Sequence, residues 1–276
     1  GDMRARGFML GGTAGRTTLN GEGLQHEDGQ SHIQSSLIPN VRSYDPTFAY
    51  EVVTIVQHGM QRMLGEQQDE YFYLTLMNEN YAHPDMPEGS AEGIIKGMYL
   101  LGDAGKPKKG ELRVQLLGSG TILREVIAAV DLLDKEFGIK ADVWSCPSFT
   151  ELARDGVDAE RWNRLHPEAK SPRVPWVTQQ LQGRSGPAIA ATDYVRTFAN
   201  QVREFVPMRY SVLGTDGYGR SDTRANLRRH FEVDRFHVAH AAVAALAADG
   251  KLTPKDVARA IKVFGIDAEK PNPLHA

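Results

Sequence analysis

An unbroken succession of strand, glycine turn, helix and second strand between residues 112 and 146 constrains the fold more than any other feature. LRVQLLGSG (112–120) is an apolar run that ends in a glycine turn. TILREVIAAVDLLDKEFG (121–138) places apolar residues at helical spacing and ends at Gly138. IKADVWSC (139–146) predicts the next strand. Since two strands joined through a helix form a right-handed parallel crossover, this part of the chain is predicted to be α/β.

The first hundred residues follow a similar order. After Asp45-Pro46, apolar residues at helical spacing predict a helix to about Leu64. YFYLTLM (71–77) predicts a buried strand, and the polar loop NENYAHPDMPEG follows at its end. Ligands of α/β proteins gather beyond the carboxyl ends of strands. Residues 7–32, by contrast, are interrupted by glycines and predict a loop around a short apolar FML element.

The length and the glycine pattern predict how the chain divides. At 276 residues it exceeds the usual size of one domain, which favours two packed α/β domains or one large domain. LLGDAGKPKKG combines glycine, proline and a lysine cluster without apolar periodicity. We therefore predict a first domain over residues 1–100, a linker over 101–111 and a second domain over 112–276.

Charge and cysteine content exclude several classes of protein. The formal net charge of −3 gives no electrostatic reason to expect a nucleic acid or an anionic membrane as partner. Cys146 is the only cysteine, so neither an intrachain disulfide nor a zinc cluster of thiolates can form. The apolar runs near Val53 and Ala241 are too short to span a bilayer. We expect a cytoplasmic protein and, since the chain starts without an initiator Met, a piece of a longer one.

The sharpest candidate for a chemical site is the glycine-flanked segment GEGLQHEDGQSH. It holds His26, Glu27, Asp28 and His32 within a short loop. An imidazole titrates near neutrality, so a histidine on a ligand-facing loop can act as an acid–base group, and a neighbouring carboxylate would raise its pKa. Spacing alone leaves open a solvated polar loop whose histidines satisfy backbone groups. A metal site is the weaker interpretation, because His-x5-His is not a standard ligand spacing.

Four further segments carry weaker signals. MNENYAHPDMPEG (77–89) could reach a cofactor cleft or form structural turns, and SFTELARDG (148–156) offers salt-bridge partners at a domain edge. LGTDGYGRSD (213–222) mainly predicts tight turns, with phosphate binding through its backbone as a weak alternative. GSG after LRVQLL lacks the full G-x-G-x-x-G pattern, so we reject a dinucleotide site of the Rossmann type.

Taken in order, GGTAGRTTLNGEGLQHEDGQSH, MNENY, GSGTILREV, SFTELARDG and LGTDGYGRSD resemble the C-terminal third of the homodimeric bacterial pyruvate dehydrogenase E1 component, a transketolase-like thiamine enzyme. The resemblance covers the whole chain. It implies an α/β fold of two three-layer domains with mainly parallel sheets. These would be the end of the pyrimidine-binding middle domain, to about residue 100, and a transketolase-type C-terminal domain.

The resemblance also assigns roles within the histidine segment. His26 matches the family histidine that contacts the substrate-derived part of the thiamine adduct, which makes it the catalytic candidate and a substrate-binding one. His32 matches a second family histidine on the substrate side. Gln30 stands where many relatives have histidine, which argues against a role for three histidines.

The family's cofactor motifs are missing from this sequence. GDG followed by an asparagine some thirty residues later does not occur, and the glutamate that activates the cofactor is expected upstream of Gly1. The resemblance therefore implies that thiamine diphosphate and Mg²⁺ are bound mainly by other parts of the enzyme, and that no metal site lies here. We expect the isolated segment to be inactive.

The resemblance implies as partners the N-terminal remainder of E1, a second E1 subunit, the E2 dihydrolipoyl acetyltransferase and pyruvate. No nucleic acid or membrane partner is expected. Two alternatives stay open: the segment serves assembly and E2 docking without chemistry of its own, or the enzyme uses another 2-oxo acid.

Overall fold

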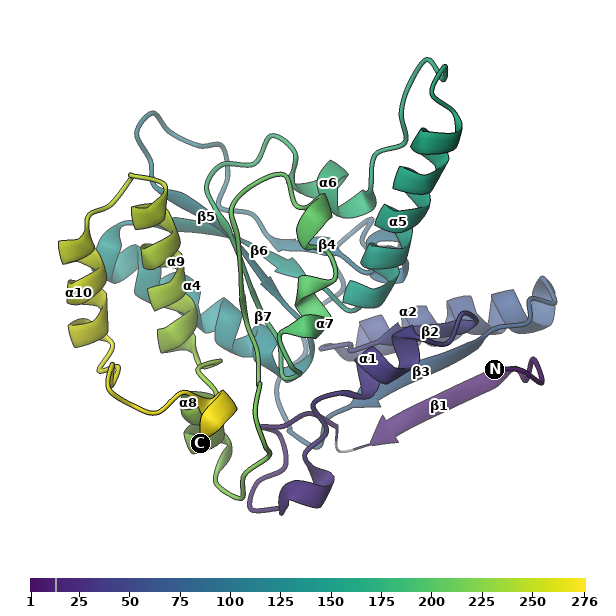
Figure 1. Ribbon diagram of the computed structural model, residues 1–276, viewed down its shortest axis with the longest axis horizontal. Helices are drawn as coiled ribbons and strands as arrows, with labels where there is room; N and C mark the ends of the chain where they lie inside the picture. The colour runs from purple at the N-terminus through teal and green to yellow at the C-terminus, as the bar shows by residue number, and fades with distance from the viewer. Residues whose placement is uncertain (13) are drawn as a thin grey trace.

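A computed structural model describes residues 1–12 and 14–276 of the chain. It is built on two β-sheets (Figure 1). The strand orders are β1-β3-β2 and β4-β6-β5-β7-β8. Every pairing is parallel except that of β4 with β6, which confirms the mainly parallel α/β class. The strands are β1 (Gly7–Gly12), β2 (Val41–Tyr44), β3 (Tyr71–Leu76), β4 (Tyr99–Gly102), β5 (Arg113–Gly118), β6 (Lys140–Ser145), β7 (Ala188–Ala191) and β8 (Tyr210–Leu213).

Helices fill the connections between the strands. The α-helices are α1 (Ser31–Ser36), α2 (Ala49–Met60), α3 (Ala91–Lys96), α4 (Leu123–Phe137), α5 (Phe149–Leu165), α6 (Trp176–Leu181), α7 (Thr197–Asn200), α8 (Arg224–His230), α9 (Arg235–Ala248) and α10 (Pro254–Val263). Shorter helical turns are η1 (Leu24–His26), η2 (Gln61–Gly65), η3 (Gly120–Ile122), η4 (Arg203–Phe205) and η5 (Pro273–His275).

The predicted crossover is present as β5, α4 and β6. The two strands pair in parallel, with Leu116 opposite Val143. α4 ends at Gly138, which adopts a left-handed conformation with φ +63°. A side chain there would be strained, so the glycine that signalled the end of the helix in the sequence also ends it in the structure.

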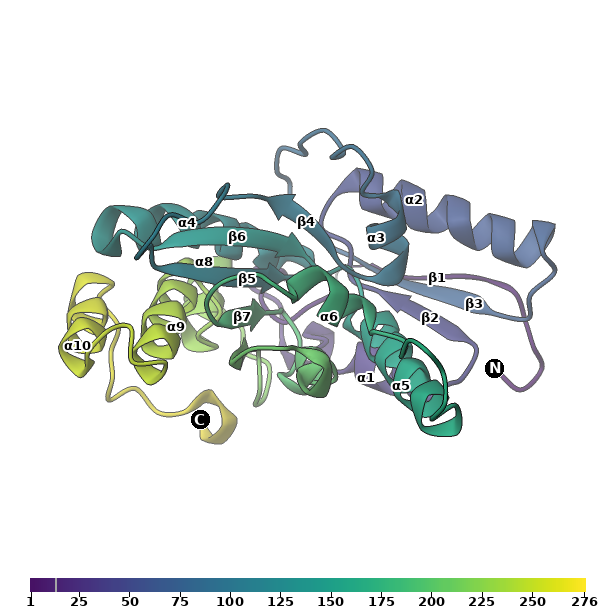
Figure 2. The same cartoon turned by 90° about the horizontal axis from the view of Figure 1, so that it is seen from above.

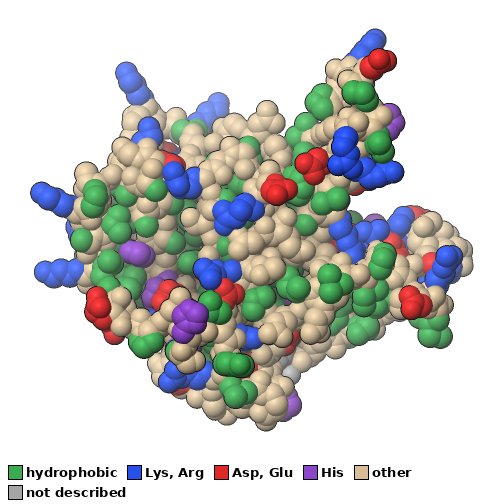
Figure 3. Space-filling model, viewed as in Figure 1, with side chains coloured by type: hydrophobic (Ala, Val, Ile, Leu, Met, Phe, Trp, Pro, Cys, Tyr) green, Lys and Arg blue, Asp and Glu red, His purple; other side chains and the backbone are tan. Residues whose placement is uncertain are grey.

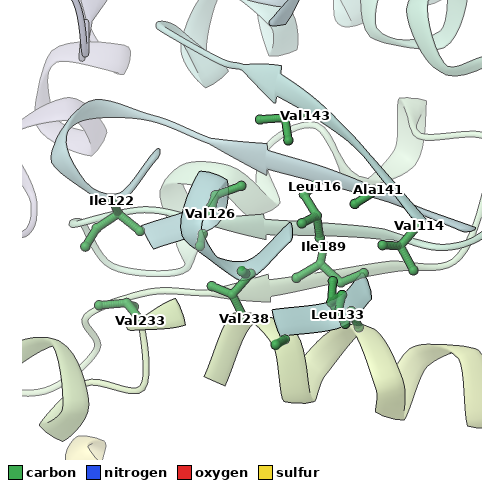
Figure 4. Packing of buried hydrophobic residues seen from close by; sticks show 14 of the residues in the cluster. Val114, Leu116, Ile122, Val126, Leu133, Ala141, Val143, Ile189, Val233 and Val238 are labelled. Carbon is green, nitrogen blue, oxygen red and sulfur yellow. The ribbon is translucent and has the colours of Figure 1, made fainter. Parts of the chain in front are cut away.

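Apolar side chains cover both faces of the five-stranded sheet. Val114 and Leu116 of β5 belong to a cluster with α4 and α9, whereas Leu117 packs on the opposite face with α5, α6 and α7. Figure 4 shows the first of these clusters, with Val126 and Val238 from the two helices facing the strands. The alternation of side chains along a strand thus gives three layers, α/β/α.

The three-stranded sheet has helices α2 and α3 on one face. Figure 2 shows both helices on one side of this sheet and α1 on the other. Phe72 and Leu74 of β3 are fully buried against Ile55 of α2 and Ile94 of α3.

Two segments differ from the sequence-based expectation. Residues 7–12, predicted as part of a loop, form β1, and Gly7 to Gly12 pair in register with Tyr71 to Leu76 of β3. β1 has three glycines among its six residues, so its own side chains give little strand signal. Residues 99–102, predicted as the end of the first domain and the start of the linker, form β4. This strand pairs with β6, so the second sheet starts at Tyr99. The domain ranges 1–100 and 112–276 stay predictions.

A buried ion cluster ties the loop after β3 to the helices of the second sheet. Glu79 Oε1 lies 2.5 Å from Arg124 Nη1 of α4, and Oε2 accepts hydrogen bonds from Thr121 and from Arg228 of α8. Burial alone would raise the pKa of Glu79, but hydrogen bonding and the charge of Arg228 outweigh it and lower the pKa to about 2. The carboxylate therefore stays ionised at neutral pH and holds this loop in place.

No helix in residues 1–12 and 14–276 is long and apolar enough to cross a membrane.

We expect Leu133→Ala, made in the full-length protein that contains this chain, to lower the free energy of unfolding by about 2–5 kcal/mol. Leu133 is fully buried on α4, so its truncation leaves a cavity against the sheet. Ile127→Ala is the control on the same helix: its side chain is 40% exposed, and we expect a change within about 0.5 kcal/mol. Urea unfolding compares the two variants, and equal losses would contradict this packing.

We expect Glu79→Gln to destabilise the full-length protein by about 3 kcal/mol at neutral pH, because the change takes from the buried Arg228 one of its two carboxylate partners and leaves only Glu125. The folded-state pKa of Glu79 is lowered, so its stabilisation is present above the ordinary value of 4.5 and is lost as the pH falls toward about 2. Thermal unfolding from about pH 6 to about pH 3.5 should show the gap between wild type and variant shrinking. A gap that stays constant over this range would refute the assignment.

Candidate active site

His26 stands exposed at the end of η1, in the segment of residues 20–30 that we call the histidine loop. Figure 1 draws this loop in purple at the bottom of the molecule. Within η1 the His26 N–H donates to Gly23 O at 3.1 Å, and the Glu27 N–H donates to Leu24 O. Among the residues that the structure describes, none makes a hydrogen bond to the His26 ring. The imidazole is therefore available for proton exchange with a ligand.

The carboxylate of Asp28 has a structural task. Its Oδ1 accepts hydrogen bonds from the main-chain N–H groups of Gln30 and Ser31 at 3.0 and 2.9 Å. Its Oδ2 accepts from the Ser31 hydroxyl. Asp28 thus satisfies the free N–H groups where α1 begins, in the manner of a helix cap.

His32 lies inside the protein, in the first turn of α1. Its Nδ1 lies 2.5 Å from Ser43 Oγ and its Nε2 lies 3.0 Å from Thr75 Oγ1, and its ring stacks on Phe198. Burial lowers its pKa to about 3, so the ring is neutral at physiological pH. Both nitrogens are bound to protein groups and the ring is fully buried. The structure does not bring His32 beside the exposed ring of His26, and its substrate-side role stays a prediction.

Two buried carboxylates at the ends of strands were missed by the sequence analysis. Asp45, directly after β2, accepts hydrogen bonds from Thr75 at 2.8 Å and from Ser119 at 2.7 Å. Asp193, two residues after β7, accepts from the Thr17 hydroxyl at 2.7 Å and from its main-chain N–H. Burial raises the pKa of each to about 7. For Asp193, the available signal was an acidic residue two positions after the apolar run AIAA, whereas VRSY before Asp45 gives no such signal.

These carboxylates lie where the carboxyl ends of the two sheets meet. Ser119, directly after β5, also lies 3.1 Å from Thr192 Oγ1, directly after β7. The segment that leads into the histidine loop is anchored at the same place, because Asp193 holds Thr17 and Arg16 Nη1 donates to Thr215 O at 2.7 Å. The base of the loop is therefore buried, while its tip is exposed.

The other predicted segments take separate positions. Glu79 lies in the ion cluster described above, and Glu151 pairs with Arg42 and Arg154 between α5 and β2. Residues 214–223, which join β8 to α8, do reach the histidine loop, where the Arg220 N–H donates to Glu27 Oε2. The sequence indicated mainly tight turns for that connection and no contact with the histidine loop.

The described residues do not suit the metal and diphosphate part of a thiamine site. No group of three or more His, Cys, Asp or Glu side chains that could hold a metal ion occurs in the part of the chain that the structure describes. Asp45 and Asp193 are fully buried and already bound to protein hydroxyls. The substrate-facing role of His26 stays a prediction.

Comparison with known proteins gives two family matches. Residues 1–84 match the pyruvate dehydrogenase E1 component middle domain, and residues 97–234 match the transketolase-like C-terminal domain. Pyruvate dehydrogenase E1 components of Cupriavidus necator and Pseudomonas aeruginosa are each 60% identical over 99% of this chain, and that of Escherichia coli K12 is 58% identical over 99%. The chain spans 30%, 31% and 30% of these relatives, respectively.

Solved structures share the fold at low sequence identity. A transketolase mutant from Pichia stipitis matches 89% of this chain with a TM-score of 0.63 and 17% identity, and 31% of that chain is covered. A split-gene transketolase, described as an inactive beta4 tetramer, matches 87% of this chain and is itself covered to 67%, with a TM-score of 0.57 and 15% identity. The resemblance drawn from the sequence is confirmed: the chain belongs to the transketolase-like family, and it joins part of a pyruvate dehydrogenase E1 middle domain to a transketolase-like C-terminal domain.

Proposed function

We propose that this chain is the C-terminal part of a pyruvate dehydrogenase E1 component and that His26 is its substrate-side acid–base residue. The observation that carries the proposal is the geometry of His26: an exposed imidazole on a loop whose base is buried and hydrogen-bonded. The identity of 58–60% to E1 components over 99% of the chain supports the reaction class. That reaction is the oxidative decarboxylation of pyruvate with acetyl transfer to the lipoyl group of E2, a step that follows glycolysis.

Thiamine diphosphate and Mg²⁺ belong to the proposal for the intact enzyme, not for this segment. The cofactor supplies the electron sink when it is bound, and the protein supplies orientation and proton transfer. Because the described residues lack a metal-binding set, we assign the binding of both groups to the upstream part of E1 and to a second subunit of a homodimer. We place the enzyme in the cytoplasm.

The exposed apolar surface of the first domain supports an assembly role beside the chemistry. A groove of about 880 Å³ runs along α2 and is lined by residues that include Val53, Met60 and Leu64, with Ile95 at its side. Met9 of β1 is also exposed. Figure 3 shows apolar side chains along the extension where Figure 1 draws β1. Since the chain spans 30% of its relatives, we propose that upstream E1 residues cover this surface.

We expect His26→Ala in the full-length enzyme to slow the formation of acetylated E2 from pyruvate by about 10²–10⁴-fold, the usual contribution of a positioned acid–base group. The change removes an exposed ring without hydrogen-bond partners in the described chain, so the melting temperature should stay close to that of the wild type. Steady-state rates at saturating E2 measure the effect.

His166→Ala is the matched control, since it removes another exposed histidine, in the loop after α5. We expect this variant to keep the wild-type rate. A wild-type rate for His26→Ala, in protein that is folded and loaded with cofactor, would refute the proposed role of His26.

A further inference from the structure

The histidine loop is fastened to a segment far along the chain, the β8–α8 connection (residues 214–223). Glu27 and Arg220, which meet in this contact, are 193 residues apart. At the start of the loop, the Gly21 N–H donates to Asp222 O at 2.9 Å, and the Ser221 hydroxyl donates to Gly21 O at 3.2 Å. Figure 1 shows the two segments side by side at the bottom of the molecule, in purple and green. Contacts on both sides of η1 thus bracket His26.

Glu27 makes the closest of these contacts. Its side chain is buried, at 6% exposed, although it directly follows the exposed His26. Its Oε2 accepts a hydrogen bond from the main-chain N–H of Arg220. A Cβ on Gly219 would lie 2.7 Å from Glu27 Oε2 and 2.8 Å from Glu27 Cβ. The glycine therefore allows the main chain of the connection to approach the loop at this point.

Arg16 makes a second contact between the histidine loop and the β8–α8 connection. It is 4% exposed, and its Nη1 donates to Thr215 O at 2.7 Å and also to Gly217 O. Gly29, near the end of the histidine loop, packs directly on this guanidinium, where a Cβ would lie 2.4 Å from Arg16 Nε. Arg16 therefore links the first half of the β8–α8 connection to the far end of the loop.

The position of His26 depends on these contacts because its own ring makes no hydrogen bond to the residues that the structure describes. Consecutive Cα atoms are separated by a fixed distance of about 3.8 Å, so a shift of Glu27 carries His26 with it. A misplacement of about 1 Å at a reacting group can cost about 10²-fold in rate.

We propose that Glu27 and Arg16 are positioning residues: they clamp the histidine loop onto the β8–α8 connection of the C-terminal domain and thereby set where the His26 imidazole stands. Both side chains are buried, and Glu27 Oε2 and Arg16 Nη1 are bound to main-chain groups of the connection. The inference rests on the proposed function of His26, and it gives the C-terminal domain a part in the reaction through backbone contacts.

The test is a double-mutant cycle in the full-length, cofactor-loaded enzyme. We expect Glu27→Ala to lower kcat for pyruvate by about 10-fold to 10²-fold, with KM changed by less than about threefold. Gly219→Ala should give the same loss from the other side of the contact, with the sequence of the histidine loop unchanged. In the His26→Ala background, Glu27→Ala should cost less than about threefold, because a positioning residue has no effect once its target is gone.

Tyr218→Ala is the control within the same connection. Its side chain is 81% exposed, and we expect it to keep the wild-type kcat. Thermal unfolding of each variant checks the fold, and Gly219→Ala replaces Glu27→Ala in the cycle if the latter is not folded.

Three results would overturn the positioning role. The first is an unchanged kcat in both Glu27→Ala and Gly219→Ala. The second is a loss from Glu27→Ala that is as large without His26 as with it. The third is a comparable loss in Tyr218→Ala. Failure of the proposed function is seen separately, as a wild-type rate in the single variant His26→Ala.

Discussion

The polar junction between the carboxyl ends of the two sheets is the contact on which the candidate site depends. Asp45 directly follows β2 and accepts from Ser119, directly after β5, while Asp193 follows β7 and accepts from Thr17. Buried carboxylates are tolerated only where hydrogen bonds replace water, and both have such partners. The junction fixes the ends of parallel strands from both sheets against each other, which is the edge where α/β proteins place ligands.

The loops at this edge are also held by buried polar contacts. Glu79 remains charged because Arg228 and Arg124 surround it, and Glu27 is fixed by a main-chain N–H of the β8–α8 connection. Polar contacts between segments distant in sequence thus hold the loop after β3 and the histidine loop in place. The result is a loop with a buried base and an exposed imidazole, the arrangement that a substrate-facing acid–base group requires.

Much of the fold could be predicted from local patterns. α4 has a continuous helical period and is flanked by glycines, and the strands β5 and β6 on either side of it are apolar. Each of these signals lies within a few consecutive residues. β1 could not be predicted in this way, because its glycines carry no side-chain signal and its hydrogen bonds are to β3, some sixty residues away. β4 is a similar case, since it is defined by its pairing with β6.

For the site, the sequence by itself determined the residue types and, through its ordered motifs, the family. Only the tertiary structure separated the two histidines: His26 is exposed, whereas His32 is enclosed by Ser43, Thr75 and Phe198. It also brought the β8–α8 connection against Glu27. The physical reason is that propensity and periodicity act over a few residues, whereas burial and hydrogen bonding across 193 residues arise only when both sheets have packed.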